Sequence, residues 1–285
     1  MGQVKGAILA DRGVVRVAGE EAVSFLQGLV TADVAGLAPG AARFAALLTP
    51  QGKILFDFLL LRAEGGFLLD GRAEALAELV KRLTFYKLRA KVEISDESGA
   101  KAVLALWGGT PQAGGFYEDP RAAALGFRAI ADKTEAERLL QEAGAETVSL
   151  DDYHAHRILL GVPEGGRDFA FGDTFPHEAN MDRLSGVSFS KGCFVGQEVV
   201  SRMQHRGTAR SRILPVAISG SPEAGSEIRA GGKALGSLLA VQGERGLALL
   251  RLDRVEAAQK AGDAITAGEA DITPLKPVWE RAPAS

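Results

Sequence analysis

Apolar residues gather in several short, strand-sized runs near the start of the chain. Residues 14–19 and 66–71 are apolar runs that end at a glycine, and each predicts a strand. Residues 43–62 predict two strands, because Pro50-Gln51-Gly52 forms a turn signal between two apolar halves. The first part of the chain is therefore expected to contain several strands.

Helical spacing of apolar residues predicts helices between and after these strands. Residues 20–27 form a short helix, and residues 72–83 form an amphipathic one. Thr134 and Glu137 make a capping-box pattern, which predicts a helix start at Thr134. Residues 151–161 predict a further helix, because acidic residues open it and a glycine closes it.

The pattern changes after Arg212, where short β runs alternate with glycine-rich turns. The runs are 213–219, 233–242 and 246–253. They predict a small antiparallel barrel or sandwich at the C-terminus. Helices and strands are mixed without a strict strand–helix–strand rhythm in the rest of the chain, so the predicted fold class is α+β.

Composition narrows the class of protein. The chain has 285 residues, a net charge of −3 and a hydrophobic content of 46%, which is typical of a soluble globular protein of two or three domains. The longest apolar runs, such as residues 56–61, are far too short to span a membrane. One cysteine cannot form an intramolecular disulfide, which fits a reducing compartment. We therefore expect a cytoplasmic protein with no membrane partner.

The single cysteine, Cys193, lies in the segment SKGCFVGQEVVSRMQHRG of residues 190–207. Glycines 192 and 196 flank it, and the helix predicted over 197–203 follows. A helix N-terminus and the neighbouring Lys191 both favour a thiolate. The alternative is a small buried side chain, since free cysteine is among the most buried residue types. The sequence does not decide between a thiolate and a buried side chain at Cys193. The histidines and this one cysteine lack the spacing of a zinc site, so no metal is expected.

Basic residues gather around the same segment. Between positions 191 and 212 the chain places five cations against Glu198, a local charge of +4. Such a patch could receive an anion, for example a phosphate, a polyglutamate tail or an RNA backbone. The alternative is an ordinary solvated surface. The cations are Lys191, Arg202, Arg206, Arg210 and Arg212.

The motif KGCFVGQE at 191–198 resembles the signature of the YgfZ-type folate-binding proteins, a branch of the glycine-cleavage T-protein (aminomethyltransferase) superfamily. The resemblance extends over nearly the whole chain. Residues 15–34 contain FLQGLVTAD, which is similar to the family's opening core. Residues 47–60, 85–94 and 175–193 are similar to its later segments, and the tail resembles its C-terminal β-barrel.

The resemblance implies three domains around a central channel that admits tetrahydrofolate or a one-carbon derivative. The first domain would combine residues 1–48 and 148–207, the second would be the insertion 49–147, and the barrel would be 210–285. The implied function is a folate-binding accessory protein for iron–sulfur cluster assembly or repair and, through it, tRNA modification. Cys193 and Lys191 would form the catalytic pair. The implied folate contacts are Asp57, Asn180, Gln197, Glu198 and Arg202.

Two departures from the T-protein pattern bear on the chemistry. T-proteins carry paired acids where this chain has Phe56-Asp57, and a folate-contacting glutamate where it has Leu159. A missing acid disfavours aminomethyl transfer, which needs a positioned acid–base group. An aminomethyltransferase is therefore the alternative function. A module that binds RNA or protein is the second alternative, which the low aromatic content of 6% disfavours for RNA. Iron–sulfur enzymes, cluster-assembly proteins and, indirectly, tRNA are the expected partners.

Overall fold

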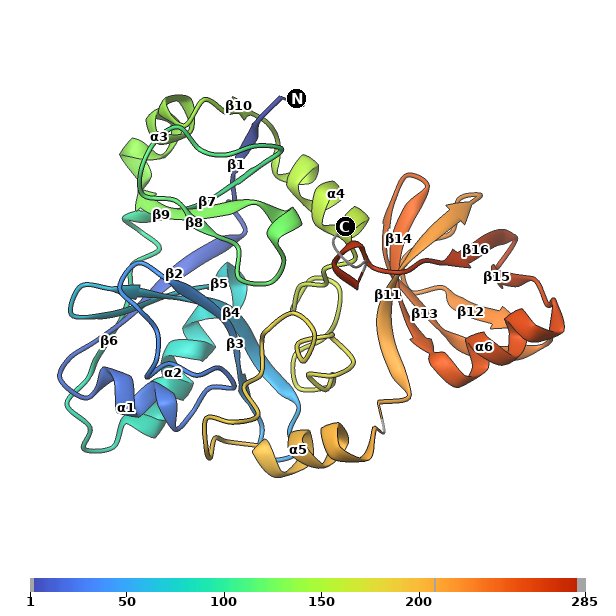
Figure 1. The fold of residues 1–285 in the computed structure, drawn as a ribbon, viewed down its shortest axis with the longest axis horizontal. Helices are drawn as coiled ribbons and strands as arrows, with labels where there is room; N and C mark the ends of the chain where they lie inside the picture. The colour runs from blue at the N-terminus through green and yellow to red at the C-terminus, as the bar shows by residue number, and fades with distance from the viewer. Residues whose placement is uncertain (1–2, 208, 281–285) are drawn as a thin grey trace, which may run out of the picture.

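The computed structural model describes residues 3–207 and 209–280, and Figure 1 shows two sheets on one side and a barrel on the other. The first sheet has the strand order β3-β4-β5-β2-β6. Its strands are antiparallel, and their apolar side chains form a core with α1 and α2. The elements are β2 (Arg12–Ala18), α1 (Ala22–Gln27), β3 (Ala42–Leu48), β4 (Ile54–Ala63), β5 (Gly66–Arg72), a 3-10 turn (Ala73–Ala75), α2 (Leu76–Lys87) and β6 (Glu93–Asp96).

The second sheet has the order β10-β1-β7-β9-β8, and α3 packs on it. Its neighbours are antiparallel except for β1 and β10, which are parallel. Its elements are β1 (Lys5–Ile8), β7 (Lys101–Trp107), β8 (Tyr117–Glu118), a 3-10 turn (Ala123–Leu125), β9 (Phe127–Asp132), a second 3-10 turn (Lys133–Glu135), α3 (Ala136–Glu142) and β10 (Glu146–Thr147).

Two helices connect the sheets to the barrel. α4 (Leu150–Leu160) begins at a capping box of Ser149 and Asp152 and ends at Gly161 in the left-handed conformation. An irregular segment of about 35 residues follows and leads into α5 (Gln197–Arg206), which lies along the lower edge of the molecule in Figure 1. No helix in the described part of the chain is long and apolar enough to cross a membrane.

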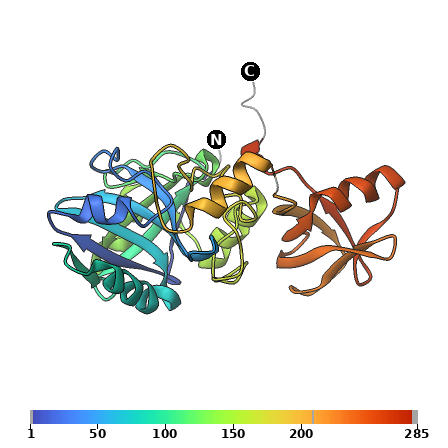
Figure 2. The same ribbon diagram turned by 90° about the horizontal axis from the view of Figure 1, so that it is seen from below.

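The C-terminal unit is a closed barrel with the strand order β11-β14-β13-β12-β15-β16. Its apolar side chains form a core of their own, and Figure 2 shows it as a separate lobe. This confirms the barrel predicted from the short β runs. The elements are β11 (Ser211–Ser219), β12 (Glu227–Ala230), β13 (Lys233–Gln242), β14 (Arg245–Arg251), α6 (Leu252–Ala261), β15 (Ile265–Ala267), β16 (Ala270–Pro274) and a 3-10 turn (Val278–Glu280).

The predicted helix start at Thr134 is wrong. Thr134 lies inside a 3-10 turn that follows directly on β9, and α3 begins at Ala136 with no side-chain cap. An N-cap residue needs an extended backbone, and Thr134 cannot adopt one within the turn. The chain has its capping box at Ser149 instead.

The predicted limits of the first two domains do not follow the strand pairing. The boundary between residues 48 and 49 separates β3 from β4, although these two strands pair along their whole length. β2 likewise pairs with β5 and β6 across that boundary. The division into 1–48 with 148–207, 49–147 and 210–285 stays a prediction, and residues 1–2, 208 and 281–285 lie outside the described residues.

Candidate functional site

The loop that carries the cysteine rests on the turn between β3 and β4. Gly196 precedes α5 with φ +79°, and a Cβ there would lie 2.5 Å from the Thr49 carbonyl oxygen. Gly52 in the turn has φ +79°, and a Cβ there would lie 2.9 Å from the Val199 Cβ. Both positions need glycine, because the backbones approach closely in a conformation that other residues disfavour. The two glycines therefore let the loop and the turn pack against each other.

Lys191 anchors the same loop to the segment after α1. Its Nζ donates hydrogen bonds to the carbonyl oxygens of Val30 (2.5 Å) and Ala32 (2.8 Å). It also lies 5.3 Å from the ring centroid of Phe194. Partial burial lowers the pKa of Lys191 to about 8, although Asp33 acts in the opposite direction. The ammonium of this lysine thus binds backbone carbonyls, whereas the sequence led us to expect it beside the sulfur.

Cys193 is exposed, between an exposed Gly192 and a buried Phe194. Phe194 packs into the core that α4 and the first sheet share with the irregular segment. Gly192 has φ +96° and open space where a Cβ would stand. The side chain of the only cysteine is therefore presented to solvent from a loop that its neighbours hold. The alternative of a buried sulfur does not describe this residue.

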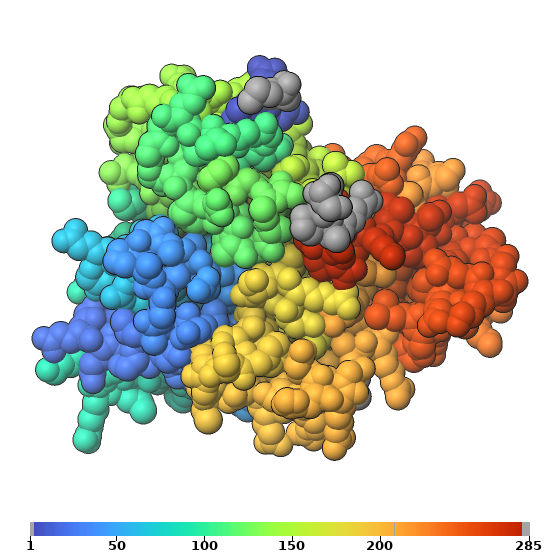
Figure 3. Space-filling model, viewed as in Figure 1, coloured from blue at the N-terminus to red at the C-terminus, as the bar shows by residue number. Residues whose placement is uncertain are grey.

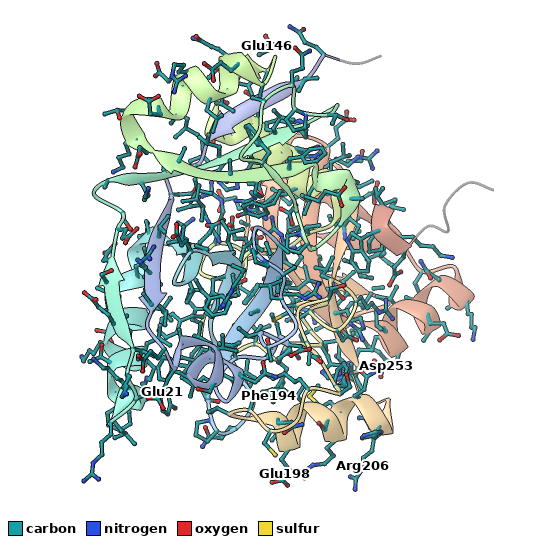
Figure 4. The ribbon with its side chains drawn as sticks, turned by 60° about the vertical axis from the view of Figure 1, so that its left-hand side comes forward. Glu21, Glu146, Phe194, Glu198, Arg206 and Asp253 are labelled. Atoms are coloured by element: carbon teal, nitrogen blue, oxygen red, sulfur yellow. The ribbon has the colours of Figure 1, made fainter. Side chains whose placement is uncertain are left out.

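The predicted contacts on α5 lie beside the cysteine loop. Gln197 is the first residue of the helix, and Glu198 forms an exposed ion pair with Arg202 one turn later (2.9 Å). Figure 4 shows Glu198 and Arg206 pointing away from the body of the protein, with Phe194 on the inner side of the helix. The structure thus brings Cys193, Gln197, Glu198 and Arg202 into one exposed region.

Asn180 lies elsewhere, in a buried position with φ +59°. Its Nδ2 donates to the Ile213 carbonyl oxygen (2.6 Å), and its Oδ1 accepts from Arg212 (3.2 Å). Arg212 is buried too and pairs with Asp182 (2.8 Å). Asn180 and Arg212 therefore join the irregular segment to the barrel. With Lys191 also turned inward, two of the five predicted cations do not contribute to an exposed basic patch.

Asp57 is buried in β4. One carboxylate oxygen accepts from the Gly165 backbone N–H (3.1 Å), and the other has no partner among the described residues. Burial raises the pKa of Asp57 to about 6 against the opposing charge of Arg12. The small hollow beside it, lined by Phe56 and Phe171, has no volume open to water. The structure therefore shows Asp57 as a buried carboxyl group in contact with Gly165.

A buried ion-pair network, which the sequence analysis missed, joins the two sheets. Arg12 of β2 pairs with Asp70 of β5 (2.6 Å) and with Glu164 (2.5 Å). Arg128 of β9 pairs with the other oxygen of Asp70 (3.2 Å). Burial alone would raise the pKa of Glu164, but the charges of Arg12 and Arg157 outweigh it and hold that pKa well below its ordinary value. The sequence feature that could have indicated this network is a charged residue within each of the apolar strands β2, β5 and β9.

α4 contributes the other half of this network. Arg157 pairs with Asp168 (2.5 Å) and donates from Nε to His154 Nδ1 (2.9 Å). The Tyr153 hydroxyl accepts from Arg128 (2.5 Å) and Arg121 (3.1 Å). The network thus ties α4 to both sheets.

Three residues of the types that ligate metal ions lie close together at the edge of the ion-pair network. They are Asp11, His154 and Glu164. Arginines already pair with both carboxylates, through Arg72 on Asp11 (2.9 Å) and Arg12 on Glu164 (2.5 Å). Both nitrogens of His154 have hydrogen-bond partners as well. A cation would have to displace these contacts, so the group is best described as part of the ion-pair network.

A roomier groove lies between the first sheet and the β8 loop. Residues 39–43, 116–120 and 122–123 line a hollow of about 650 Å³, and a second hollow of about 380 Å³ adjoins it at Arg43 and Ser185. None of the site residues predicted from the sequence lines either hollow. The second hollow does approach the cysteine loop, because Ala32, whose carbonyl oxygen accepts from Lys191, is among its lining residues.

Comparison with known proteins accounts for this architecture. Residues 9–115 match the GCVT N-terminal domain, and residues 210–282 match the CAF17 C-terminal beta-barrel domain. The human mitochondrial iron–sulfur cluster assembly factor IBA57 is 35% identical over 280 residues, which cover 87% of this chain and 78% of the relative. The chain belongs to the IBA57 family of iron–sulfur cluster assembly factors.

A second relative agrees with this assignment, and a solved structure shows the same fold. The mitochondrial IBA57 homolog of Mycosarcoma maydis is 37% identical over 238 residues, which cover 76% of this chain and 59% of the relative. The crystal structure of the glycine cleavage system aminomethyltransferase T from Bartonella henselae has a TM-score of 0.75 at 17% identity. It covers 97% of this chain and 86% of the aminomethyltransferase, and so shows a shared fold.

Membership of the IBA57 family confirms two predictions and leaves others standing. The T-protein-like fold with its C-terminal barrel is confirmed, and so is a relationship to iron–sulfur cluster assembly factors. The relatives named here are IBA57 factors, so the YgfZ-type branch stays a prediction. The cytoplasmic localisation also stays a prediction, since these relatives are named as mitochondrial proteins.

Proposed function

We propose that this protein assists iron–sulfur cluster assembly by supplying one thiolate, from Cys193, to a cluster carried by a partner protein. The exposure of the only cysteine carries the proposal. Iron–sulfur clusters are held by several cysteine thiolates. A chain with one cysteine cannot hold such a cluster alone, so the remaining ligands come from the partner, and the cluster is cargo.

The surroundings of Cys193 suit this role. Lys191 and Phe194 hold the backbone on either side of the cysteine, while the thiol itself faces solvent. A held backbone lowers the entropy lost when the sulfur binds iron. The thiol releases its proton on binding, and solvent accepts it at this exposed position. Cys193 and Lys191 thus have different tasks, ligation and anchoring.

The test is complex formation with a cluster-carrying assembly protein purified from the same cells. Under anaerobic conditions we expect the wild type to co-elute with the loaded carrier and with its visible absorbance. Cys193→Ser should fold normally and lose this co-elution. Ser190→Ala, a change at an exposed position of the same loop, is the matched control and should behave as the wild type. Equal co-elution of Cys193→Ser would contradict the proposal.

We also propose tetrahydrofolate or a one-carbon derivative as a ligand, in the manner of the YgfZ-type branch. The T-protein-like fold supports it. Leu159 in place of the folate-contacting glutamate favours weak binding, in the low micromolar range or above, roughly −8 kcal/mol or less favourable. Calorimetric titration tests it, with Cys193→Ser expected to bind folate as the wild type does. An unchanged melting temperature at millimolar tetrahydrofolate would contradict folate binding.

The two alternative functions have less support. Aminomethyl transfer needs an acid–base group at the substrate, and the Asp57 carboxylate is enclosed by the 163–172 segment. RNA binding by the basic cluster has less support because Lys191 and Arg212 bind groups inside the protein and are not available to RNA. An effect on tRNA modification would follow from failing iron–sulfur enzymes, and modified nucleosides in tRNA from cells that lack the protein would report it.

A further inference from the structure

The end of α2 carries a concentration of positive charge that the cluster-assembly role does not use. Residues 79–92 contain five cations and no acid, in a chain whose net charge is −3. We call residues 81–91 the α2 corner. In Figure 3 side chains of this teal part of the chain protrude at the lower left edge. The cations are Lys81, Arg82, Lys87, Arg89 and Lys91.

Two large apolar side chains stand in the middle of these charges. Phe85 is 70% exposed and Leu88 is 88% exposed. Leu88 also has φ +45° and ψ −107°, a conformation that a residue with a Cβ rarely adopts. An unfavourable backbone that turns a leucine into solvent brings no gain in the isolated protein. Such features gather at sites where a ligand is held.

The charges of the α2 corner are mostly free. Lys81 pairs with Glu78 (3.5 Å) and Lys91 with Glu20 (3.1 Å), and both pairs are exposed. Arg82, Lys87 and Arg89 have no carboxylate within ion-pair distance among the residues that the structure describes. Three unpaired cations therefore flank the exposed phenylalanine and leucine along the chain.

We propose that the α2 corner binds the surface of an anionic membrane. Phenylalanine and leucine side chains enter the boundary between headgroups and acyl chains, while arginine and lysine bind the anionic headgroups. A standard protein interface needs about 800 Å² per partner, and two side chains at a protruding corner offer little of that. A fluid lipid surface can close around such a corner. Peripheral binding of this kind needs no membrane-spanning segment, so it revises the expectation of no membrane partner.

The test is sedimentation of the full chain with lipid vesicles. Phosphatidylcholine vesicles with and without about 30% phosphatidylglycerol separate anionic from neutral lipid. The double variant Phe85→Ser with Leu88→Gly removes the apolar side chains, and glycine suits the backbone at position 88. Leu159→Ser is the matched control, because Leu159 is 53% exposed on α4, away from the corner. Thermal melting confirms that each variant is folded.

We expect the wild type and Leu159→Ser to bind anionic vesicles at least about tenfold more tightly than neutral ones. The double variant, or about 0.5 M salt, should weaken this binding by a similar factor. Cys193→Ser should bind vesicles as the wild type does, so failure here is separable from failure of the proposed function. Equal binding to both lipids, no binding, or an unaffected double variant would overturn the proposal. A different result is that the wild type does not bind vesicles and the double variant loses affinity for a purified carrier protein. In that case the α2 corner is a protein interface and the membrane proposal fails.

Discussion

Replacing Gly196 by alanine is expected to damage the cysteine loop more than the same change at Gly192. Both glycines have positive φ, +79° and +96°. At Gly196 a Cβ would lie 2.5 Å from the Thr49 carbonyl oxygen and 3.1 Å from the Gly52 Cα, which are backbone atoms that no rotamer change can move. At Gly192 no atom lies within 4 Å of the Cβ position. The pair of variants separates backbone strain from steric contact.

The structure sets the size of each effect. A left-handed conformation costs a residue with a Cβ about 1–2 kcal/mol, and this applies to both variants. Overpacking adds about 1–3 kcal/mol at Gly196 alone. We therefore expect the free energy of unfolding to fall by about 1–2 kcal/mol for Gly192→Ala and by about 2–5 kcal/mol for Gly196→Ala.

Urea unfolding measures the two losses, provided that the slope of the free energy against urea is the same for all proteins. Amide hydrogen exchange of the loop and of the turn at residues 49–52 should rise in Gly196→Ala and not in Gly192→Ala. Losses that agree within about 0.5 kcal/mol would refute the claim that contact with the turn fixes the loop.

Three further predictions concern the buried charges. Because the folded pKa of Asp57, about 6, lies above its ordinary value of 3.8, Asp57 stabilises the fold at low pH and loses that contribution as pH rises through 6. The free energy of unfolding of the wild type, relative to Asp57→Asn, should therefore fall by about 3 kcal/mol between about pH 4 and pH 7, measured by urea unfolding. Arg12→Met should cost about 3–5 kcal/mol, because it leaves Asp70 and Glu164 buried with fewer partners. Lys191→Met should cost about 1–3 kcal/mol and speed hydrogen exchange at residues 190–194, since two carbonyls lose their donor.

Opposite outcomes would count against each of these arguments. A difference between wild type and Asp57→Asn that is independent of pH would mean that Asp57 is hydrated in the folded state. A loss for Arg12→Met as small as that for the exposed Arg82→Met would mean that the network contributes little. Normal exchange in Lys191→Met would leave the loop without its supposed anchor.

The elements of the fold followed from the sequence where burial selects apolar residues along an element. The apolar runs at 14–19 and 66–71 became β2 and β5, which are buried on both faces, and residues 151–161 became α4, whose buried residues recur at helical spacing. The turn signal at residues 50–52 predicted two consecutive strands, which are β3 and β4, whereas the domain limit at residue 48 was transferred from a resemblance and separates these paired strands.

The candidate site was predicted only where chemistry could be seen in one segment. The loop around Cys193 was found because its glycines and cysteine stand together in the sequence. The inward orientation of Lys191 and Arg212 was not predicted, because a run of charged residues does not reveal which of them have buried partners. The ion-pair network was missed for a related reason, as Arg12 and Glu164 are 152 positions apart.

The most direct test of the central claim is the alkylation rate of Cys193 with and without a cluster on the partner. Iodoacetamide should modify the exposed thiol readily in the isolated protein and equally in the presence of the apo carrier. With the cluster-loaded carrier, under anaerobic conditions, the rate should fall at least about tenfold, because a thiolate bound to iron is not free to react. Equal rates with the apo and the loaded carrier would contradict the account.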